Sequence, residues 1–461
     1  MHFAPFQPQL VRHQARLYAQ SQQASGPFVK LMPWLLAPVN IQAAWRRIST
    51  NDGALTPGVD GVTCRDIATQ LPRYLAQLTD ELRVGTYRPQ PPRWVEIPKP
   101  SNPSRKRRLG ILTIRDRLVH AAAKAVLEPL FEPTFAPTSF GFRPGRSVPA
   151  ALAAAARAAS ARGSDAAPFS VGVHLDVADC FDSLDHSRLF SLVRQHVADA
   201  DFLRLLDGLW AAGGRTLGWL WRHRCGVVQG SSLSPLLCNL YLHAVDEALA
   251  ALAERRHHGL LTLRYADDLL ILARDRALGR EGIRTASRVL GRGRLRLRNP
   301  DAEPSPLAAG IVWLGVVLRP RRGGPPCCAD FGYEIPDEKI TSMFETVTEM
   351  TATGVWPIPE SRLAAGLQEL NDKLRQWREA YALADNAAPT FRRLDTHARD
   401  CVGRLLVQAT GRRGQRLERF RRSGNAGGWT WEAGGVRLLQ LAELPPRKAG
   451  RLVRKPAWQR S

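Results

Sequence analysis

The chain has 461 residues, of which 44% are hydrophobic and 23% charged, so it can bury large cores and is not disordered by composition. It carries 65 Lys and Arg against 42 Asp and Glu, a net charge of +23 that favours a nucleic acid partner; the alternative is a general arginine bias, because only 8 of the 65 are lysine. No apolar run predicts a transmembrane helix, no signal peptide pattern opens the chain, and the 7 scattered cysteines indicate neither a disulfide framework nor a zinc module.

The first two thirds of the chain mix helix and strand patterns. Residues 148–162 are predicted to form an Ala-rich helix, and residues 184–206 carry helical spacing. Residues 170–177 suit a strand, whereas 260–263 and 269–272 suit the two strands of a β-hairpin. The Pro- and Gly-rich stretch 319–326 is predicted to be a linker between domains.

Strand signals fade after residue 330. Apolar residues from Leu363 to Tyr381 recur every three or four positions, and a second such series runs from Phe391 to Leu405. The two series predict a helical hairpin, and hence a helical C-terminal domain.

Much of the excess positive charge lies at the C-terminus. Residues 401–461 hold 14 Lys and Arg against 3 acidic residues, a net charge of +11, with Trp429, Trp431 and Trp458 interleaved. Such a tail can bind a phosphate backbone and stack on bases, or it can be a frayed, solvated tail; the sequence leaves both interpretations open.

Acidic residues gather at two points of the mixed region. Asp176 ends a predicted strand, and Asp267 and Asp268 lie at the turn of the predicted hairpin. Neighbouring carboxylates repel one another unless a cation neutralises them, and three together can hold two divalent ions that catalyse nucleotidyl transfer. The alternative is an ordinary polar turn. We expect Asp182 and Asp185 to cap the following helix instead.

A glycine-flanked turn over residues 226–232 precedes an apolar helix. Such a turn can bring the backbone close to a nucleotide or template, or it can simply be a helix start capped by serine. In chain order, Asp176 with residues 181–182, then 229–235, then 265–268 resemble motifs A, B and C of reverse transcriptases. Further segments are similar to the group II intron reverse transcriptase/maturase lineage: residues 57–61, 97–100, 107–111, 115–117, 127–129, 139–147, 313–315 and 371–381.

The resemblance implies an α/β (α+β) right-hand polymerase. Its implied domains are an N-terminal extension (1–66), fingers and palm with an antiparallel sheet (67–320), an all-helical thumb or maturase-like domain (330–410) and a basic C-terminal tail (411–461).

The resemblance also implies roles for individual residues. Asp176, Asp267 and Asp268 would be catalytic and, with the backbone carbonyl of Val177, would bind two Mg²⁺ ions, for which Mn²⁺ could substitute. The implied nucleotide-binding residues are Lys99 and Arg107 at the triphosphate, Phe181 as the gate beneath the sugar, and Gln229 and Gly230. The implied primer and template contacts are Tyr265, Trp313, Leu314 and Gly315.

The implied activity is RNA-directed DNA polymerisation, with an RNA template, a DNA or RNA primer and deoxynucleoside triphosphates (dNTPs) as partners, no membrane partner, and a cytoplasmic location in the bacterial cytosol or nucleoid. One alternative is an intron maturase or scaffold for a cognate structured RNA. Another is a domesticated reverse transcriptase that serves phage defence, CRISPR spacer acquisition or DNA repair.

The chain departs from the family pattern at two places. Ala302 stands where motif D often has a lysine thought to protonate the leaving pyrophosphate, and arginine is a poor proton donor because its pKa exceeds about 12. His257 or His258 could serve only if the fold brings one of them near. The His and paired Cys of the intron endonuclease are also missing, so we expect no such nuclease here.

Overall fold

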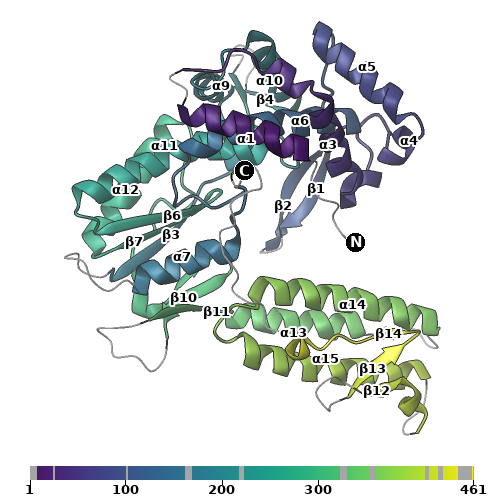
Figure 1. Ribbon diagram of the computed structural model, residues 1–461. Helices are drawn as coiled ribbons and strands as arrows, with labels where there is room; N and C mark the ends of the chain where they lie inside the picture. The colour runs from purple at the N-terminus through teal and green to yellow at the C-terminus, as the bar shows by residue number, and fades with distance from the viewer. Residues whose placement is uncertain are drawn as a thin grey trace. The chain divides into compact units, whose positions relative to one another are not determined.

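The computed structural model describes residues 8–23, 26–99, 102–160, 169–217, 223–321, 330–352, 359–410, 415–423, 429–444 and 459. The chain divides into two compact units (Figure 1): the first comprises residues 1–151, 163–305 and 453–461, and the second comprises 152–162 and 306–452. Each unit has its own hydrophobic core.

The first unit is built around one buried helix, α6, in which 14 of 18 residues are buried. The side chain of Thr113 starts it by accepting a hydrogen bond from the Asp116 amide, and α1 and α3 pack on it. The N-terminal segment is thus part of this core. The helices up to this point are α1 (Pro8–Gln23), α2 (Met32–Leu35), α3 (Pro38–Ser49), the 3-10 helix η1 (Asp52–Leu55), α4 (Cys64–Ala68), α5 (Leu71–Val84), α6 (Ile114–Phe131) and the 3-10 helix η2 (Glu132–Thr134).

The helix predicted over 184–206 is two helices. The chain breaks at Asp199, whose carboxylate accepts from the amide of Phe202 at 3.0 Å and from the amide of Leu31 at 2.7 Å. Asp185 caps its helix as predicted, whereas Asp182 lies inside a short helix and not at its N-cap position, which Asp179 occupies. The remaining helices numbered before the second unit are α7 (Val148–Ser160), α8 (Cys180–Ser183), α9 (His186–Arg194), α10 (Ala200–Gly213), α11 (Ser234–Arg255) and α12 (Arg276–Arg292).

A small antiparallel sheet lies against α11 and α12 (Figure 1). Its strand order is β6-β7-β3-β8, and it confirms both the predicted strand over 170–177 and the predicted hairpin. Its strands are β3 (Val171–Asp176), β6 (Leu260–Tyr265), β7 (Asp268–Ala273) and β8 (Ser305–Pro306). Two hairpins stand apart from it, formed by β1 (Arg93–Lys99) with β2 (Asn102–Ile111) and by β4 (Arg215–Leu217) with β5 (His223–Cys225).

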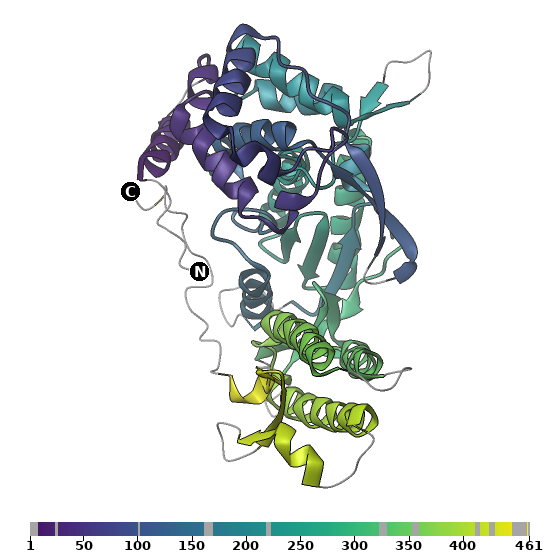
Figure 2. The same cartoon turned by 90° about the vertical axis from the view of Figure 1, so that its right-hand side faces the viewer.

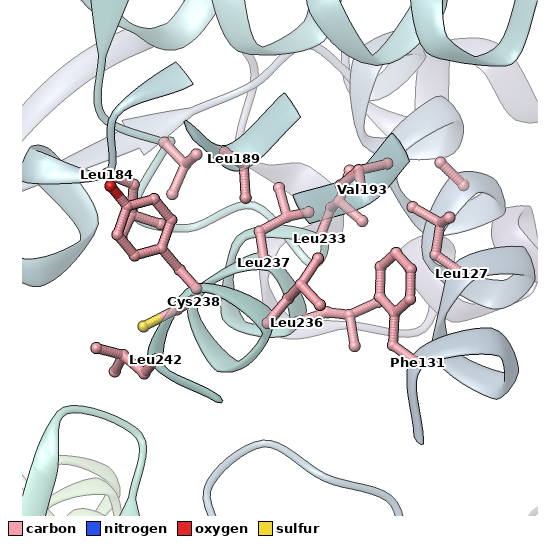
Figure 3. Packing of buried hydrophobic residues seen from close by; sticks show 14 of the residues in the cluster. Leu127, Phe131, Leu184, Leu189, Val193, Leu233, Leu236, Leu237, Cys238 and Leu242 are labelled. Atoms are coloured by element: carbon pink, nitrogen blue, oxygen red, sulfur yellow. The ribbon is translucent and has the colours of Figure 1, made fainter. Parts of the chain in front are cut away.

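Helix α11 is the apolar centre of the first unit. Figure 3 shows Leu236 and Leu237 of α11, together with the preceding Leu233, among Leu127 and Phe131 of α6 and Leu189 and Val193 of α9. By length and composition α11 could cross a membrane, and 67% of its most apolar window is buried inside the protein. Buried core helices commonly satisfy the same test.

From residue 306 onward, the second unit runs through three strands and then three long helices (Figure 2). The elements up to its last long helix are the 3-10 helix η3 (Leu307–Ala309), β9 (Ile311–Trp313), β10 (Val316–Pro320), β11 (Phe331–Glu334), α13 (Asp337–Thr351), α14 (Glu360–Tyr381) and α15 (Ala387–Thr410). Helices α14 and α15 confirm the predicted helical hairpin. The unit starts at 306, upstream of the expected boundary at 320, because β10 pairs with both β9 and β11.

Within the segment predicted to be a basic tail, the described residues 415–423 and 429–444 are folded. They form the 3-10 helix η5 (Gln415–Phe420), β12 (Arg421–Ser423), β13 (Trp429–Ala433), β14 (Val436–Arg437) and the 3-10 helix η6 (Leu441–Glu443), so the helical domain also carries a small sheet. Trp431 is buried and its indole donates to the Arg399 carbonyl at 2.8 Å. The Asp395 carboxylate accepts from two amides of η6 at 2.7 and 2.8 Å. Trp458 lies outside the described residues.

Candidate active site

Strand register brings the three predicted catalytic aspartates to one end of the sheet. Asp176 is the last residue of β3 and lies directly opposite Asp268, the first residue of β7. Asp267 lies in the turn between β6 and β7, and its carbonyl accepts a hydrogen bond from the Val177 amide at 3.2 Å. Residues that are far apart in the sequence therefore meet at a single edge.

A buried arginine, Arg264, is hydrogen-bonded to the backbone of this turn. Ala266 adopts a left-handed backbone conformation with φ of 57°, and its carbonyl accepts from the Arg264 guanidinium at 2.9 Å. The same guanidinium donates to both Asp246 carboxylate oxygens, at 2.8 and 2.6 Å, and to Asn239 at 2.9 Å. Only 1% of Arg264 is exposed, so a satisfied ion pair from α11 fixes the backbone next to Asp267.

Burial and neighbouring negative charge disfavour the ionised forms of Asp267 and Asp176. Burial, followed by the charges of Asp268 and Asp176, raises the pKa of Asp267 to about 6. Burial also raises the pKa of Asp176, against the lowering effect of Arg298. Clustered carboxylates with raised pKa values are the electrostatic setting that a bound cation relieves.

Two of the carboxylates have positively charged or ionisable partners. The Arg298 guanidinium forms an ion pair with Asp176, and His174 Nε2 lies 2.9 Å from the Asp268 carboxylate. Among the described residues, no three acidic, His or Cys side chains are arranged as a ready-made ligand set. The donors themselves are carboxylate oxygens, which suit hard divalent ions such as Mg²⁺. Val177 is buried beside them, and its carbonyl stays a predicted ligand.

The loop before α11 is tied to both neighbouring motifs. The Val227 amide donates to the Phe181 carbonyl at 2.8 Å, and the Gly110 amide of β2 donates to the Gln229 carbonyl at 2.7 Å. Gly230 has a φ of +111°, and a Cβ there would lie 2.8 Å from the Gly110 carbonyl oxygen, so only glycine fits. Phe181, Gln229 and Gly230 are thus connected through one backbone network.

The remaining predicted residues are placed as follows. Arg107 is exposed on β2, and Lys99 ends β1 with a side chain outside the described part of the chain. Tyr265 lies opposite Asp268 at the end of β6, half-buried, with its ring centroid 6.5 Å from that of Phe142. Burial raises its pKa.

Trp313, Leu314 and Gly315 belong to the second unit. They form the tight turn between β9 and β10, with φ of 50° at Leu314 and 80° at Gly315. Trp313 is 1% exposed and therefore packs in the unit's interior. Their contact with a primer stays a prediction.

Sequence reasoning missed His174, Arg264 and Arg298. His174 could have been found, because it shares a strand face with Asp176 two residues later. Arg264 is a charged residue in an apolar strand, which is itself a signal. Arg298 directly precedes the Asn-Pro of motif D, where only a lysine was sought; Ala302, in the lysine position, is half-buried against the core.

Comparison with known proteins identifies relatives. A family model described as reverse transcriptase (RNA-dependent DNA polymerase) matches residues 97–299. Protein YkfC of Escherichia coli (strain K12) is 31% identical over 315 residues, covering 62% of this chain and 82% of YkfC. Group II intron-encoded protein LtrA of Lactococcus lactis subsp. cremoris is 34% identical over 220 residues, covering 48% of this chain and 35% of LtrA. The chain therefore spans about a third of LtrA.

Proposed function

Because this chain belongs to the reverse transcriptase (RNA-dependent DNA polymerase) family, in its group II intron-like branch, we propose that it extends a primer 3′-hydroxyl with deoxynucleotides on an RNA template. The observation that carries the proposal is the register that sets Asp176 opposite Asp268 with Asp267 in the adjoining turn. Three carboxylates at one edge provide the negative charge that nucleotidyl transfer needs around its metal ions.

Members of this family need divalent metal, and we propose Mg²⁺, with Mn²⁺ as a substitute. Asp176, Asp267 and Asp268 would hold the ions, which supply activation of the primer hydroxyl and stabilisation of charge on the transferred phosphate. Lys99 and Arg107 would hold the triphosphate by charge. Phe181 would lie beneath the sugar and disfavour a 2′-hydroxyl, and Gln229 and Gly230 would contact the nucleotide and template.

The proposed partners are an RNA template, a DNA or RNA primer and dNTPs, in the bacterial cytosol or nucleoid. A second candidate function is that of a maturase, which would bind a cognate structured RNA and help it fold. It is favoured by the similarity to LtrA, a group II intron-encoded protein, and by the chain's net charge of +23. Service in phage defence, CRISPR spacer acquisition or DNA repair would use the same polymerase chemistry.

Primer extension on an RNA template tests the polymerase proposal. The wild type and the control Asp301→Ala, which removes an exposed carboxylate from the same unit, are expected to extend the primer, whereas Asp267→Ala is not. Equal extension by wild type and Asp267→Ala would refute the assignment. If intron splicing survives Asp267→Ala, the maturase function exists alongside polymerisation.

A further inference from the structure

Arg298 is anchored beside the catalytic aspartates by its backbone. Its amide donates to the Asp176 carbonyl at 2.8 Å, and the Ala178 amide donates to the Arg296 carbonyl at 2.9 Å. Between them Val177 and Leu297 form an antiparallel bridge. Backbone hydrogen bonds and this isolated bridge thus hold the segment 296–298 against the residues at the end of β3.

The side chain of Asn299, the next residue, also binds the backbone of β3. Its side-chain oxygen lies 3.4 Å from the Asp176 amide, and its side-chain nitrogen donates to the His174 carbonyl at 3.1 Å. With the backbone fixed on both sides, only the Arg298 side chain is left to move. That side chain is 37% exposed, so water reaches it and rotation needs no opening of the core.

The ion pair conflicts with metal binding. The positively charged Arg298 guanidinium pairs with the Asp176 carboxylate that a divalent ion needs. It also adds a positive charge next to the site, which opposes a second cation. Because the pair is partly exposed, the interaction to be broken is modest, and exchange with an ion is feasible.

We propose that Arg298 alternates between two anions: Asp176 in the metal-free protein, and the triphosphate of the incoming nucleotide once metal ions have taken Asp176. This inference rests on the proposed polymerase function. A displaced guanidinium on a fixed backbone stays at the rim of the site, and its planar fork of donors suits phosphate oxygens. Arg298 thereby supplies a positive charge from the same stretch of sequence in which Ala302 stands where the family often has a lysine. It would act on the triphosphate by its charge and not by proton transfer.

Two measurements on Arg298→Ala and Arg298→Gln test the proposal. Mn²⁺ binding, followed by electron paramagnetic resonance without nucleotide or nucleic acid, is expected to tighten roughly threefold to tenfold, because the competing cation is gone. The KM for dNTP in primer extension is expected to rise by a similar factor, because a phosphate contact is lost. If Arg298 had only a structural role, its loss would weaken Mn²⁺ binding as well as raise the KM for dNTP. Tighter Mn²⁺ binding together with a higher KM therefore distinguishes the proposal from a structural role. Arg298→Lys should lie between these variants and the wild type.

Arg296→Ala is the matched control, since it removes an exposed arginine from the same segment, 296–298, and should change neither quantity. Unchanged or weaker Mn²⁺ binding in both Arg298 variants would overturn the proposal, and so would an unchanged KM. Such a failure would leave the polymerase assignment intact, because that assignment is tested separately by Asp267→Ala.

Discussion

Arg264 and Asp246 form a fully buried, bidentate ion pair that joins the catalytic turn to α11, with N–O distances of 2.8 and 2.6 Å. The side chains are 1% and 2% exposed. The pair reaches the site through one further hydrogen bond, from Arg264 to the Ala266 carbonyl next to Asp267. Arg264 is therefore a positioning residue for the carboxylate cluster.

Replacing Arg264 with Met should lower the free energy of unfolding by about 3–5 kcal/mol, because it leaves Asp246 as an unpaired buried charge. The double variant Arg264→Met with Asp246→Leu should recover much of that stability but not the polymerase rate, since the Ala266 carbonyl still lacks its donor. Thermal unfolding and primer extension measure the two effects. A double variant no more stable than the single one would contradict this account.

Asp267→Asn should stabilise the metal-free protein at neutral pH. The pKa of Asp267 is about 6 in the folded state against an ordinary value of 3.8, so folding favours its protonated form. Its contribution to stability is full below about pH 4 and is lost as the pH rises through about 6. The Asn variant avoids that loss, and we expect a gain of ~1 kcal/mol at pH 7 after solvent screening. Melting curves in chelator at pH 4 to 8 would show the two proteins diverging as the pH rises; parallel curves would contradict the prediction.

The stabilisation of the protein by Mg²⁺ should increase as the pH rises, whereas the stability contributed by protonated Asp267 decreases. Metal binds the ionised carboxylates, so protons compete with it below the pKa of Asp267, which is about 6. The rise in melting temperature caused by Mg²⁺ should therefore be small at pH 5 and reach its full size above pH 7. The Asp267→Asn protein serves as the control, with little rise at either pH. A Mg²⁺ effect independent of pH would argue against this carboxylate as a ligand.

Trp431→Ala should lower the stability of the second unit, because Trp431 is a buried core residue and not an exposed side chain available to stack on bases. Trp431 is 8% exposed, and its indole packs against Gly403 and donates to the Arg399 carbonyl. Truncating a buried aromatic of this size costs about 3–5 kcal/mol. Arg422→Ala, on the exposed strand β12, removes charge with little effect on the core and is the matched comparison. Differential scanning calorimetry of the full chain separates the two, and equal melting of both variants would contradict the buried role.

Phe181→Ala should relax discrimination against ribonucleotides. Phe181 is half-buried in α8, and its carbonyl is held by the Val227 amide, so the ring can be truncated without moving the backbone. If the ring excludes the 2′-hydroxyl, its loss should raise the ratio of kcat/KM for rNTP to that for dNTP by roughly 10- to 100-fold. An unchanged ratio would mean that Phe181 is a core residue only.

The sequence predicted the secondary structure best where periodicity was strong. The hairpin around Asp267 and helices α14 and α15 were predicted because their apolar residues recur at regular spacing. The break before α10 was missed, because it depends on Asp199 binding an amide of residue 31 far away in the chain. The sheet β12–β14 was missed for a similar reason, since charge dominated the composition there and the burial of Trp431 depends on long-range contacts such as its hydrogen bond to Arg399 of α15.

The acidic residues of the candidate site could be predicted from the sequence, whereas the basic residues that contact them in the structure, Arg298 and His174, were not. The order of Asp176, Asp267 and Asp268 along the chain identified them before any geometry was known. Arg298 is placed beside Asp176 only by long-range backbone pairing, and His174, although it shares a strand face with Asp176, is identified as the partner of Asp268 only by the register of β3 with β7. Long-range pairing of this kind has no local sequence pattern, which is why motif reading found the acidic residues and not their partners.

The most direct test of the central claim is Mg²⁺-dependent incorporation of a single dNTP on an RNA template, compared between Asp176→Asn and Asp179→Asn. Both variants remove one negative charge from the same short segment, but only Asp176 lies opposite Asp268, whereas Asp179 is exposed and has a left-handed backbone conformation that asparagine tolerates. We expect Asp179→Asn to incorporate at close to the wild-type rate and Asp176→Asn to show no incorporation above background. Wild-type incorporation by Asp176→Asn would contradict the account.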